Sequence, residues 1–268
     1  MNPYLIETPF SVSFSGGRTS GYMLRKILDA YGGELPKDGH VLFGNTGNEM
    51  EETLAFIHEV ETKWCPVTWL EWQKDMPKFK LVNYTSASRK GEPFAALIES
   101  RNYIPNPVAR FCTSDLKVKS FSRYMRTLGY DEWNTCLGLR ADERRRVSRI
   151  KGDTRRDNVL CPLNTANVVK EDVISWWSTQ EFDLRLPDND QSFGNCDMCF
   201  LKARWMIERV MIANPERAQW WIDQEAKIGA TFRSDRPSYK EMFIQITTQG
   251  RLFDAPKDES TMPCDCTE

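Results

Sequence analysis

Histidine is nearly missing from this sequence, which contains only His40 and His58 among its 268 residues. A metal site of two or three histidines, or a catalytic triad that relies on a histidine base, therefore has almost nothing to draw on. Charge of one sign is not in excess either, because the formal net charge is −2. Without an overall cationic field, any contact with nucleic acid has to come from a local cluster of basic side chains.

Long apolar runs are also missing. No window approaches the roughly 18 apolar residues of a membrane-spanning helix, and the first residues lack the basic and apolar segments of a secretion signal. We therefore expect a cytoplasmic protein. In a reducing compartment, the eight cysteines indicate a metal site more than a disulfide framework. The hydrophobic residues, 40% of the chain, are ample for a packed core.

Short β-prone runs alternate with helical patterns along the first half of the chain. The expected strands are, in chain order, residues 9–14, 40–44, 67–70 and 133–139. The first expected helix carries Tyr22, Met23, Ile27 and Leu28 on one face and stops at Gly32-Gly33. The other expected helices are residues about 50–64, about 114–128, 168–177, 201–213 and 215–228. This alternation predicts an α/β fold, an open parallel sheet with helices on both faces.

The second half of the chain is mainly helical in pattern. We expect an α/β domain over residues 1–160 and a helical C-terminal region over residues 161–268. Within the first domain, four prolines interrupt residues 74–111, which we interpret as an insertion or a lid.

The turn after the first expected strand reads Ser-Gly-Gly-Arg-Thr-Ser, residues 15–20. Glycines let the backbone approach an anion closely, and the free N–H groups of a helix start, with the Ser and Thr hydroxyls, can donate to it. The carboxyl end of a strand is also where open α/β sheets bind ligands. The turn therefore predicts a phosphate cradle, with an ordinary helix cap as the alternative.

The same hexapeptide resembles the pyrophosphate loop of the PP-loop ATP pyrophosphatases. Three further features resemble the phosphoadenosine phosphosulfate (PAPS) reductase branch of that superfamily, and all occur in the family's order. They are Asn45-Thr46-Gly47 before Glu52-Thr53-Leu54, then Gly138-Leu139-Arg140, then Cys161-Pro162-Leu163 before Glu171-Asp172-Val173. The resemblance spans about residues 10 to 200 and implies a Rossmann-like, PP-loop sheet that binds ATP or a related adenosine nucleotide.

The resemblance also implies the residues of the nucleotide site. These are Ser15, Gly16, Gly17, Arg18, Thr19, Ser20, Asn45, Thr46, Gly138 and Arg140. Two positions depart from the family's pattern, because Thr19 and Asn45 each stand where the family carries Asp. The first departure weakens any magnesium-linked role for that position, and the second removes a negative charge.

Cys196 and Cys199 form a Cys-x-x-Cys directly before an expected helix, which aims two thiolates at one ion. A redox disulfide or a pair of buried thiols is the alternative. Cys112 lies in a segment that resembles the one carrying cluster ligands in iron-sulfur sulfonucleotide reductases. The resemblance therefore implies a [4Fe-4S] cluster on Cys112, Cys196 and Cys199, with Cys264, or alternatively Cys266, as the fourth ligand.

Four cysteines serve equally well for zinc, which is the competing metal. The other cysteines, Cys65, Cys136 and Cys161, are expected to be small buried hydrophobes.

Residues 140–156 contain eight basic and three acidic side chains. Arginine's planar fork suits phosphate or sulfate, so this stretch, Arg140 to Arg156, is a candidate contact for a substrate phosphate or for an RNA or DNA acceptor. A solvated surface is the alternative.

Two reactions are compatible with these features. One is adenylation of an acceptor with pyrophosphate release, followed by sulfur transfer, or thiolation. The other is thiol-dependent reduction of a sulfonucleotide, for which the tail lacks the family's Glu-Cys-Gly-x-x-His motif, so no catalytic residue is assigned. A zinc-stabilised nucleotide- or nucleic-acid-binding protein without turnover is the remaining alternative. The sequence does not identify the electron or sulfur donor, and it leaves open whether the chain forms a homo-oligomer.

Overall fold

The computed structural model describes residues 2–151 and 158–249. Cys264 and Cys266, and Arg155 and Arg156 of the basic stretch, lie outside the described residues.

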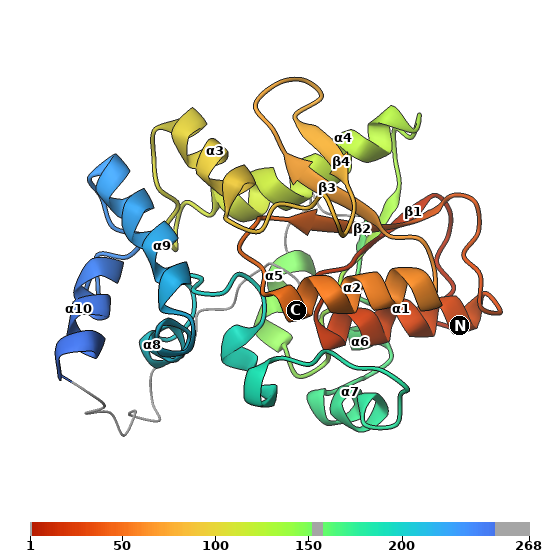
Figure 1. The fold of residues 1–268 in the computed structure, drawn as a ribbon. Helices are drawn as coiled ribbons and strands as arrows, with labels where there is room; N and C mark the ends of the chain where they lie inside the picture. Colours follow the sequence, from red (N-terminus) through yellow and green to blue (C-terminus); the bar gives the residue numbers. More distant parts are fainter. Residues whose placement is uncertain (1, 152–157, 250–268) are drawn as a thin grey trace.

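A six-stranded sheet in the order β4-β3-β2-β1-β5-β6 organises the fold (Figure 1). The strands are β1 Phe10–Ser13, β2 Gly39–Asn45, β3 Thr68–Trp72, β4 Phe79–Val82, β5 Asn134–Cys136 and β6 Val159–Leu160. All neighbours pair in parallel except β4, which runs antiparallel to β3. The expected α/β fold is therefore confirmed, with one antiparallel edge strand that the sequence did not predict. A link of residues 73–78 is too short for a parallel crossover, which needs about a dozen residues.

Helices cover both faces of the sheet. In chain order they are α1 Arg18–Ala30, α2 Glu51–Lys63, α3 Glu92–Arg101, the π-helical turn η1 Cys112–Val118, α4 Lys119–Thr127, α5 Arg144–Lys151, α6 Pro162–Thr165, α7 Lys170–Trp177, the 3-10 turns η3 Pro187–Asn189 and η4 Gln191–Phe193, α8 Arg204–Ala213, α9 Pro215–Ile228 and α10 Tyr239–Gln249. Helices α1 and α2 lie on one face, and α3 and α4 lie on the other (Figure 1).

Helices α8, α9 and α10 lie beyond the carboxyl edge of the sheet (Figure 1). Two contacts fix them there: the Asp197 N–H donates to the Asn48 carbonyl, and Arg217 of α9 donates to the Glu49 carbonyl. The ring of Trp221 stacks on that of Tyr239 with centroids 5.2 Å apart. Both rings belong to the hydrophobic cluster that also contains the strand residues. The helical region and the sheet thus share one core, with the loops after the strands between them.

Candidate functional site

The point where the strand order reverses lies at β1. The chain proceeds from β1 to β2 on one side and later returns to β5 on the other side. Loops from the carboxyl ends of two such strands diverge and leave a crevice, which is where open α/β sheets bind ligands. Here those loops are residues 14–17 and 137–140, and Arg140 Nη1 donates to Thr19 Oγ1 across them at 3.0 Å. The structure therefore brings the glycine turn and the Gly138–Arg140 segment together.

The backbone of the glycine turn is shaped by Gly16. Its φ is +78°, and a Cβ there would lie 2.6 Å from Thr53 Cγ2 and 2.7 Å from Ile57 Cδ1 of α2. Helix α1 begins one residue after Gly17, and no side chain in the described part of the chain caps it. The first N–H groups of a helix have no partner within the helix, so they are available to an anion.

The serine hydroxyls of the turn act within the turn itself. Ser15 Oγ and Ser20 Oγ lie 3.0 Å apart, and Ser20 Oγ also accepts from the Ser15 N–H at 3.2 Å. Ser20 Oγ donates to the Gly17 carbonyl as well. In this arrangement the hydroxyls stabilise the conformation of the turn.

Arg18 directs its guanidinium to the segment that follows α7. Its Nε and Nη2 each lie 2.7 Å from a different oxygen of the Asp183 carboxylate, and Nη2 also donates to the Leu184 carbonyl. A charge-assisted bidentate pair of this kind fixes geometry. Arg18 therefore anchors the start of α1 to residues 183–184.

Asn45, at the end of β2, is fully buried in a polar network. Its amide donates to Glu71 Oε1 at 2.6 Å and to the Ser88 carbonyl at 2.9 Å, while its Oδ1 accepts from the Gly47 N–H. Glu71 on β3 is buried as well and also accepts from the Ser88 N–H and hydroxyl. Sequence reasoning missed Glu71, although a carboxylate among Trp69, Leu70 and Trp72 was a signal.

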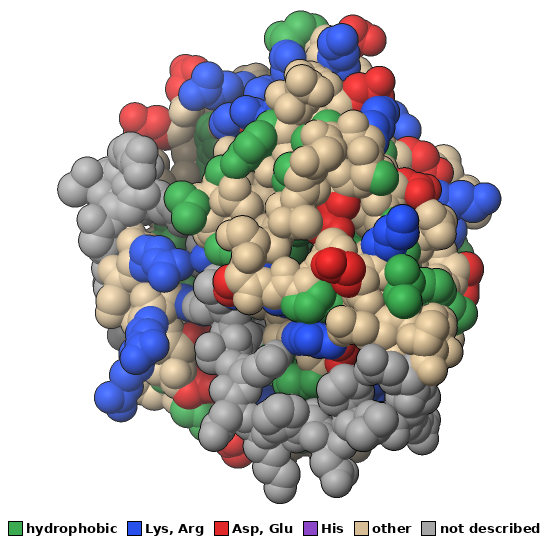
Figure 2. Space-filling view, turned by 90° about the vertical axis from the view of Figure 1, so that its left-hand side faces the viewer, with side chains coloured by type: hydrophobic (Ala, Val, Ile, Leu, Met, Phe, Trp, Pro, Cys, Tyr) green, Lys and Arg blue, Asp and Glu red, His purple; other side chains and the backbone are tan. Residues whose placement is uncertain are grey.

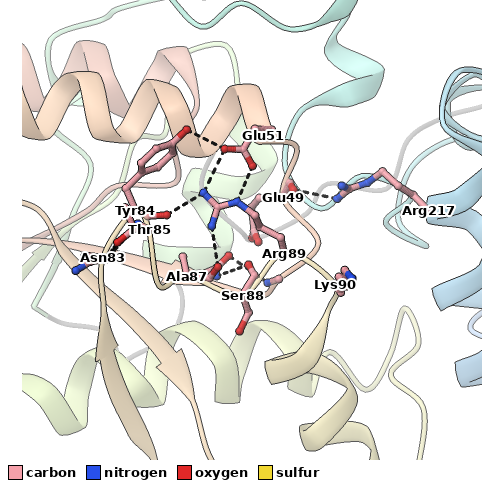
Figure 3. Close-up of polar contacts among 12 residues, drawn as sticks. Glu49, Glu51, Asn83, Tyr84, Thr85, Ala87, Ser88, Arg89, Lys90 and Arg217 are labelled. Carbon is pink, nitrogen blue, oxygen red and sulfur yellow. Dashed lines mark hydrogen bonds and ion pairs between the residues drawn. The ribbon is translucent and has the colours of Figure 1, made fainter.

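Residues 83–91 form a loop beside this edge of the sheet, and hydrogen bonds hold it to α2 (Figure 3). Arg89 Nε donates to Glu51 Oε2 at 2.7 Å, and the guanidinium also donates to the carbonyls of Tyr84 and Ala87. Tyr84 Oη donates to the other Glu51 oxygen. The Arg89 hydrogen bond lowers the pKa of Glu51. This part of the expected insertion is thus tied to the first turn of α2.

Thr46, the residue after β2, connects the carboxyl edge of the sheet to the cysteines. Its N–H and its hydroxyl both donate to Glu49 Oε2, and each donor atom lies 2.9 Å from that oxygen. Burial raises the pKa of Glu49. The positive charge of Lys117 and the hydrogen bonds from Thr46 lower this pKa, but by less than burial raises it. Thr46 Oγ1 also lies 3.4 Å from Cys196 Sγ. The end of β2 therefore contacts the Cys-x-x-Cys segment directly.

Cys112, Cys196 and Cys199 line one cavity. The other lining residues are Thr46, Phe94, Thr113, Leu116, Lys117, Phe200, Leu201 and Trp221. Cys112 begins the π-helical turn, a type of segment that occurs often at functional sites. The donor chemistry, three thiols beside an apolar wall, suits an iron-sulfur or zinc site. Among residues 2–151 and 158–249, however, no three His, Cys, Asp or Glu side chains form a group that could hold a metal ion.

The remaining cysteines lie in the core as expected. Cys65, Cys136 and Cys161 are all buried. Burial raises the pKa of the Cys65 and Cys136 thiols to about 12, so neither is a ready nucleophile.

The basic stretch divides into buried and exposed arginines. Arg140 and Arg146 are buried, whereas Arg144, Arg145 and Arg149 of α5 are exposed. The Arg140 fork meets Asp142, with Nε 3.0 Å from Oδ1 and Nη2 3.2 Å from Oδ2. The stretch is therefore not one uniform surface. On the face of the molecule that Figure 2 shows, basic and acidic side chains are interspersed among those drawn in colour.

These features define a mixed α/β protein whose glycine turn, β2 end and Gly138–Arg140 segment meet at the carboxyl edge of a mostly parallel sheet. No family model matches the sequence. The "Uncharacterized nin region protein ORF290" of Escherichia phage lambda is 32% identical over 251 residues, which cover 90% of this chain and 81% of the phage protein. The chain belongs to the family of this phage protein.

Among solved structures, a phosphoadenylyl-sulfate (PAPS) reductase from Candida auris, crystallised as a phosphate complex, matches 66% of this chain and 79% of its own. The TM-score is 0.39 and the sequence identity is 14%. A search of the described helices for one long and apolar enough to cross a membrane found none.

Proposed function

We propose that this protein is a PAPS reductase-like PP-loop enzyme that binds ATP or a related adenosine nucleotide with its phosphates at residues 15–20. The observation that carries the proposal is the meeting of residues 15–20 with Gly138–Arg140 at the switch point, joined by the Arg140–Thr19 hydrogen bond. The start of α1, which has no side-chain cap among the described residues, supports an anion at the turn.

We further propose that the cysteine cavity is the sulfur-handling part of the same site. Thr46 belongs to both, since it directly follows β2 and lines the cavity beside Cys196. Cys112, Cys196 and Cys199 would hold an iron-sulfur cluster together with Cys264 or Cys266. Such a cluster supplies electron transfer or a binding position for sulfide. The reaction class is sulfur transfer after adenylation or reduction of a sulfonucleotide.

Calorimetric titration of the purified protein tests the nucleotide proposal. We expect ATP to bind at least tenfold more tightly than adenosine, because the amides of the turn contact the phosphates and not the nucleoside. Equal affinity for the two ligands, or no binding of ATP or of a sulfonucleotide, contradicts the proposal. Release of pyrophosphate during ATP turnover selects adenylation, whereas release of sulfite from a sulfonucleotide selects reduction.

Anaerobic purification with iron, sulfide and zinc analysis tests the cluster. We expect a brown protein that loses most of its iron and sulfide in Cys196→Ser and in Cys199→Ser. Cys65→Ala removes a buried thiol outside the cavity and is the matched control, so it should keep both elements. A colourless protein with stoichiometric zinc selects the zinc alternative, and a protein without either metal contradicts both.

A further inference from the structure

Arg146 is buried, with 8% of its surface exposed, yet one edge of its guanidinium lacks an acceptor. Its Nη1 donates to Glu143 Oε1. Its Nε and Nη2 are shielded from solvent, and among the described residues neither has a hydrogen-bond partner. Arginine keeps its charge in proteins, and buried polar groups are nearly always paired. The unpaired edge of Arg146 therefore points to a ligand.

The two unpaired atoms are the ones that recognise oxyanions. Nε and Nη2 form the fork of a guanidinium, which donates two parallel hydrogen bonds to one carboxylate, phosphate or sulfate. In Arg140 the equivalent fork is engaged by the two oxygens of Asp142. Of the two buried arginines near the switch point, Arg146 is thus the one whose fork has no protein acceptor among the described residues.

Glu143 places Arg146 close to the glycine turn. One Glu143 oxygen accepts from the Arg140 N–H at 2.9 Å, and the other accepts from Arg146. Arg140 in turn donates to Thr19 in the first turn of α1. A continuous chain of hydrogen bonds therefore runs from the glycine turn through Arg140 and Glu143 to Arg146.

We propose that Arg146 binds a tetrahedral oxyanion, the phosphoryl or sulfuryl group of the nucleotide, through its Nε–Nη2 fork. Arg140 and Glu143 then act as positioning residues, since Glu143 binds Nη1 of Arg146 and the N–H of Arg140. This inference rests on the proposed function and adds the residue that reads the anionic group. Because the fork is shielded, binding requires local movement of the side chains that cover it.

Nucleotide titration and thermal unfolding of the full chain test the inference. The variants are Arg146→Gln and Arg146→Lys, with Arg145→Gln as the matched control because it removes an exposed arginine from the same helix. We expect Arg146→Gln to weaken ATP binding by roughly 10- to 100-fold, the value of lost charge-assisted hydrogen bonds. Arg146→Lys keeps the charge without the fork and should not restore affinity, and Arg145→Gln should change it by less than about threefold.

The effect of ligand on stability separates this role from a structural one. Arg146→Gln leaves Glu143 with Arg140 as its remaining arginine partner among the described residues, so we expect a lower unfolding temperature than in the wild type. We also expect ATP to raise the unfolding temperature of Arg146→Gln less than that of the wild type. A lowered temperature together with unchanged ATP affinity would show a structural residue and overturn the inference.

Thermal unfolding with inorganic pyrophosphate or sulfate, each compared with chloride at equal ionic strength, distinguishes a site for free oxyanions from a site for nucleotides. If they stabilise the wild type but not Arg146→Gln, and ATP does not bind, the fork takes an oxyanion while the nucleotide function fails. If ATP binds equally to Arg146→Gln and Arg145→Gln, the nucleotide function stands and the inference fails. If neither nucleotides nor inorganic anions stabilise the wild type, both fail.

Discussion

Gly16→Ala is expected to destabilise the protein by about 2–5 kcal/mol and to abolish nucleotide binding. Two effects add at this position. A φ of +78° is costly for any residue with a Cβ, by roughly 1–2 kcal/mol. The new methyl group would also meet Thr53 and Ile57 of α2 at 2.6 and 2.7 Å, which forces the turn and the helix apart at about 1–3 kcal/mol. Urea unfolding measures the loss, and ATP titration measures the binding.

Gly32→Ala provides the matched control. Gly32 has almost the same φ, +77°, but a Cβ there meets nothing within 4 Å. Only the backbone cost remains, so we expect a loss of roughly 1–2 kcal/mol with unchanged ATP affinity. Equal losses in the two variants would show that the close approach to α2 does not constrain the turn.

The strands and the switch point could be predicted because they depend on short-range patterns. Apolar runs such as Phe10–Ser13 and Gly39–Asn45 alternate with amphipathic helices, and this alternation favours a parallel sheet. The antiparallel direction of β4 follows from the short link after β3. The prolines of this region hid the strand pattern, so β4 itself was not predicted. Sequence reasoning interpreted that region only as an insertion.

The roles of individual charged side chains could not be predicted, because they depend on partners far away in the sequence. Arg18 belongs to the predicted phosphate loop, yet Asp183, 165 residues later, engages its fork. Arg146 was one of several arginines in a basic stretch, and only its burial and unpaired edge set it apart from Arg145. Long-range pairing decides which basic side chains remain for a ligand, and composition does not reveal it.

Asn45 pairs with a buried carboxylate on the neighbouring strand. Its amide lies 2.6 Å from Glu71 Oε1, and Lys80 Nζ lies 2.9 Å from Glu71 Oε2. Two carboxylates as close as Asn45 and Glu71 are, in a buried site, cannot both ionise. The neutral, donating amide of Asn45 is therefore a suitable partner for Glu71.

Asn45→Asp is accordingly expected to cost about 3–5 kcal/mol at neutral pH, because the new carboxyl group must either ionise beside Glu71 or hold its proton at a pH far above its ordinary pKa. The introduced carboxyl group has to keep its proton to donate to Glu71, so its pKa in the folded state rises above the value of about 3.9 in the unfolded chain. The folded variant then binds more protons than the unfolded chain, and its stability falls as pH rises. We expect the deficit relative to wild type to be small near pH 4 and to grow toward pH 7 in urea unfolding.

The double variant Asn45→Asp with Glu71→Gln reverses the polarity of this pair. The Gln amide can donate to the introduced carboxylate, so a donor and an acceptor again face each other. We expect the double variant to lose most of the pH dependence, because no two carboxylates share a proton. It should recover only part of the loss at pH 7, since the Ser88 N–H loses its Glu71 acceptor and the Ser88 carbonyl loses its Asn45 donor. If the single variant is equally destabilised at pH 4 and pH 7, like-charge repulsion at Glu71 is not the cause.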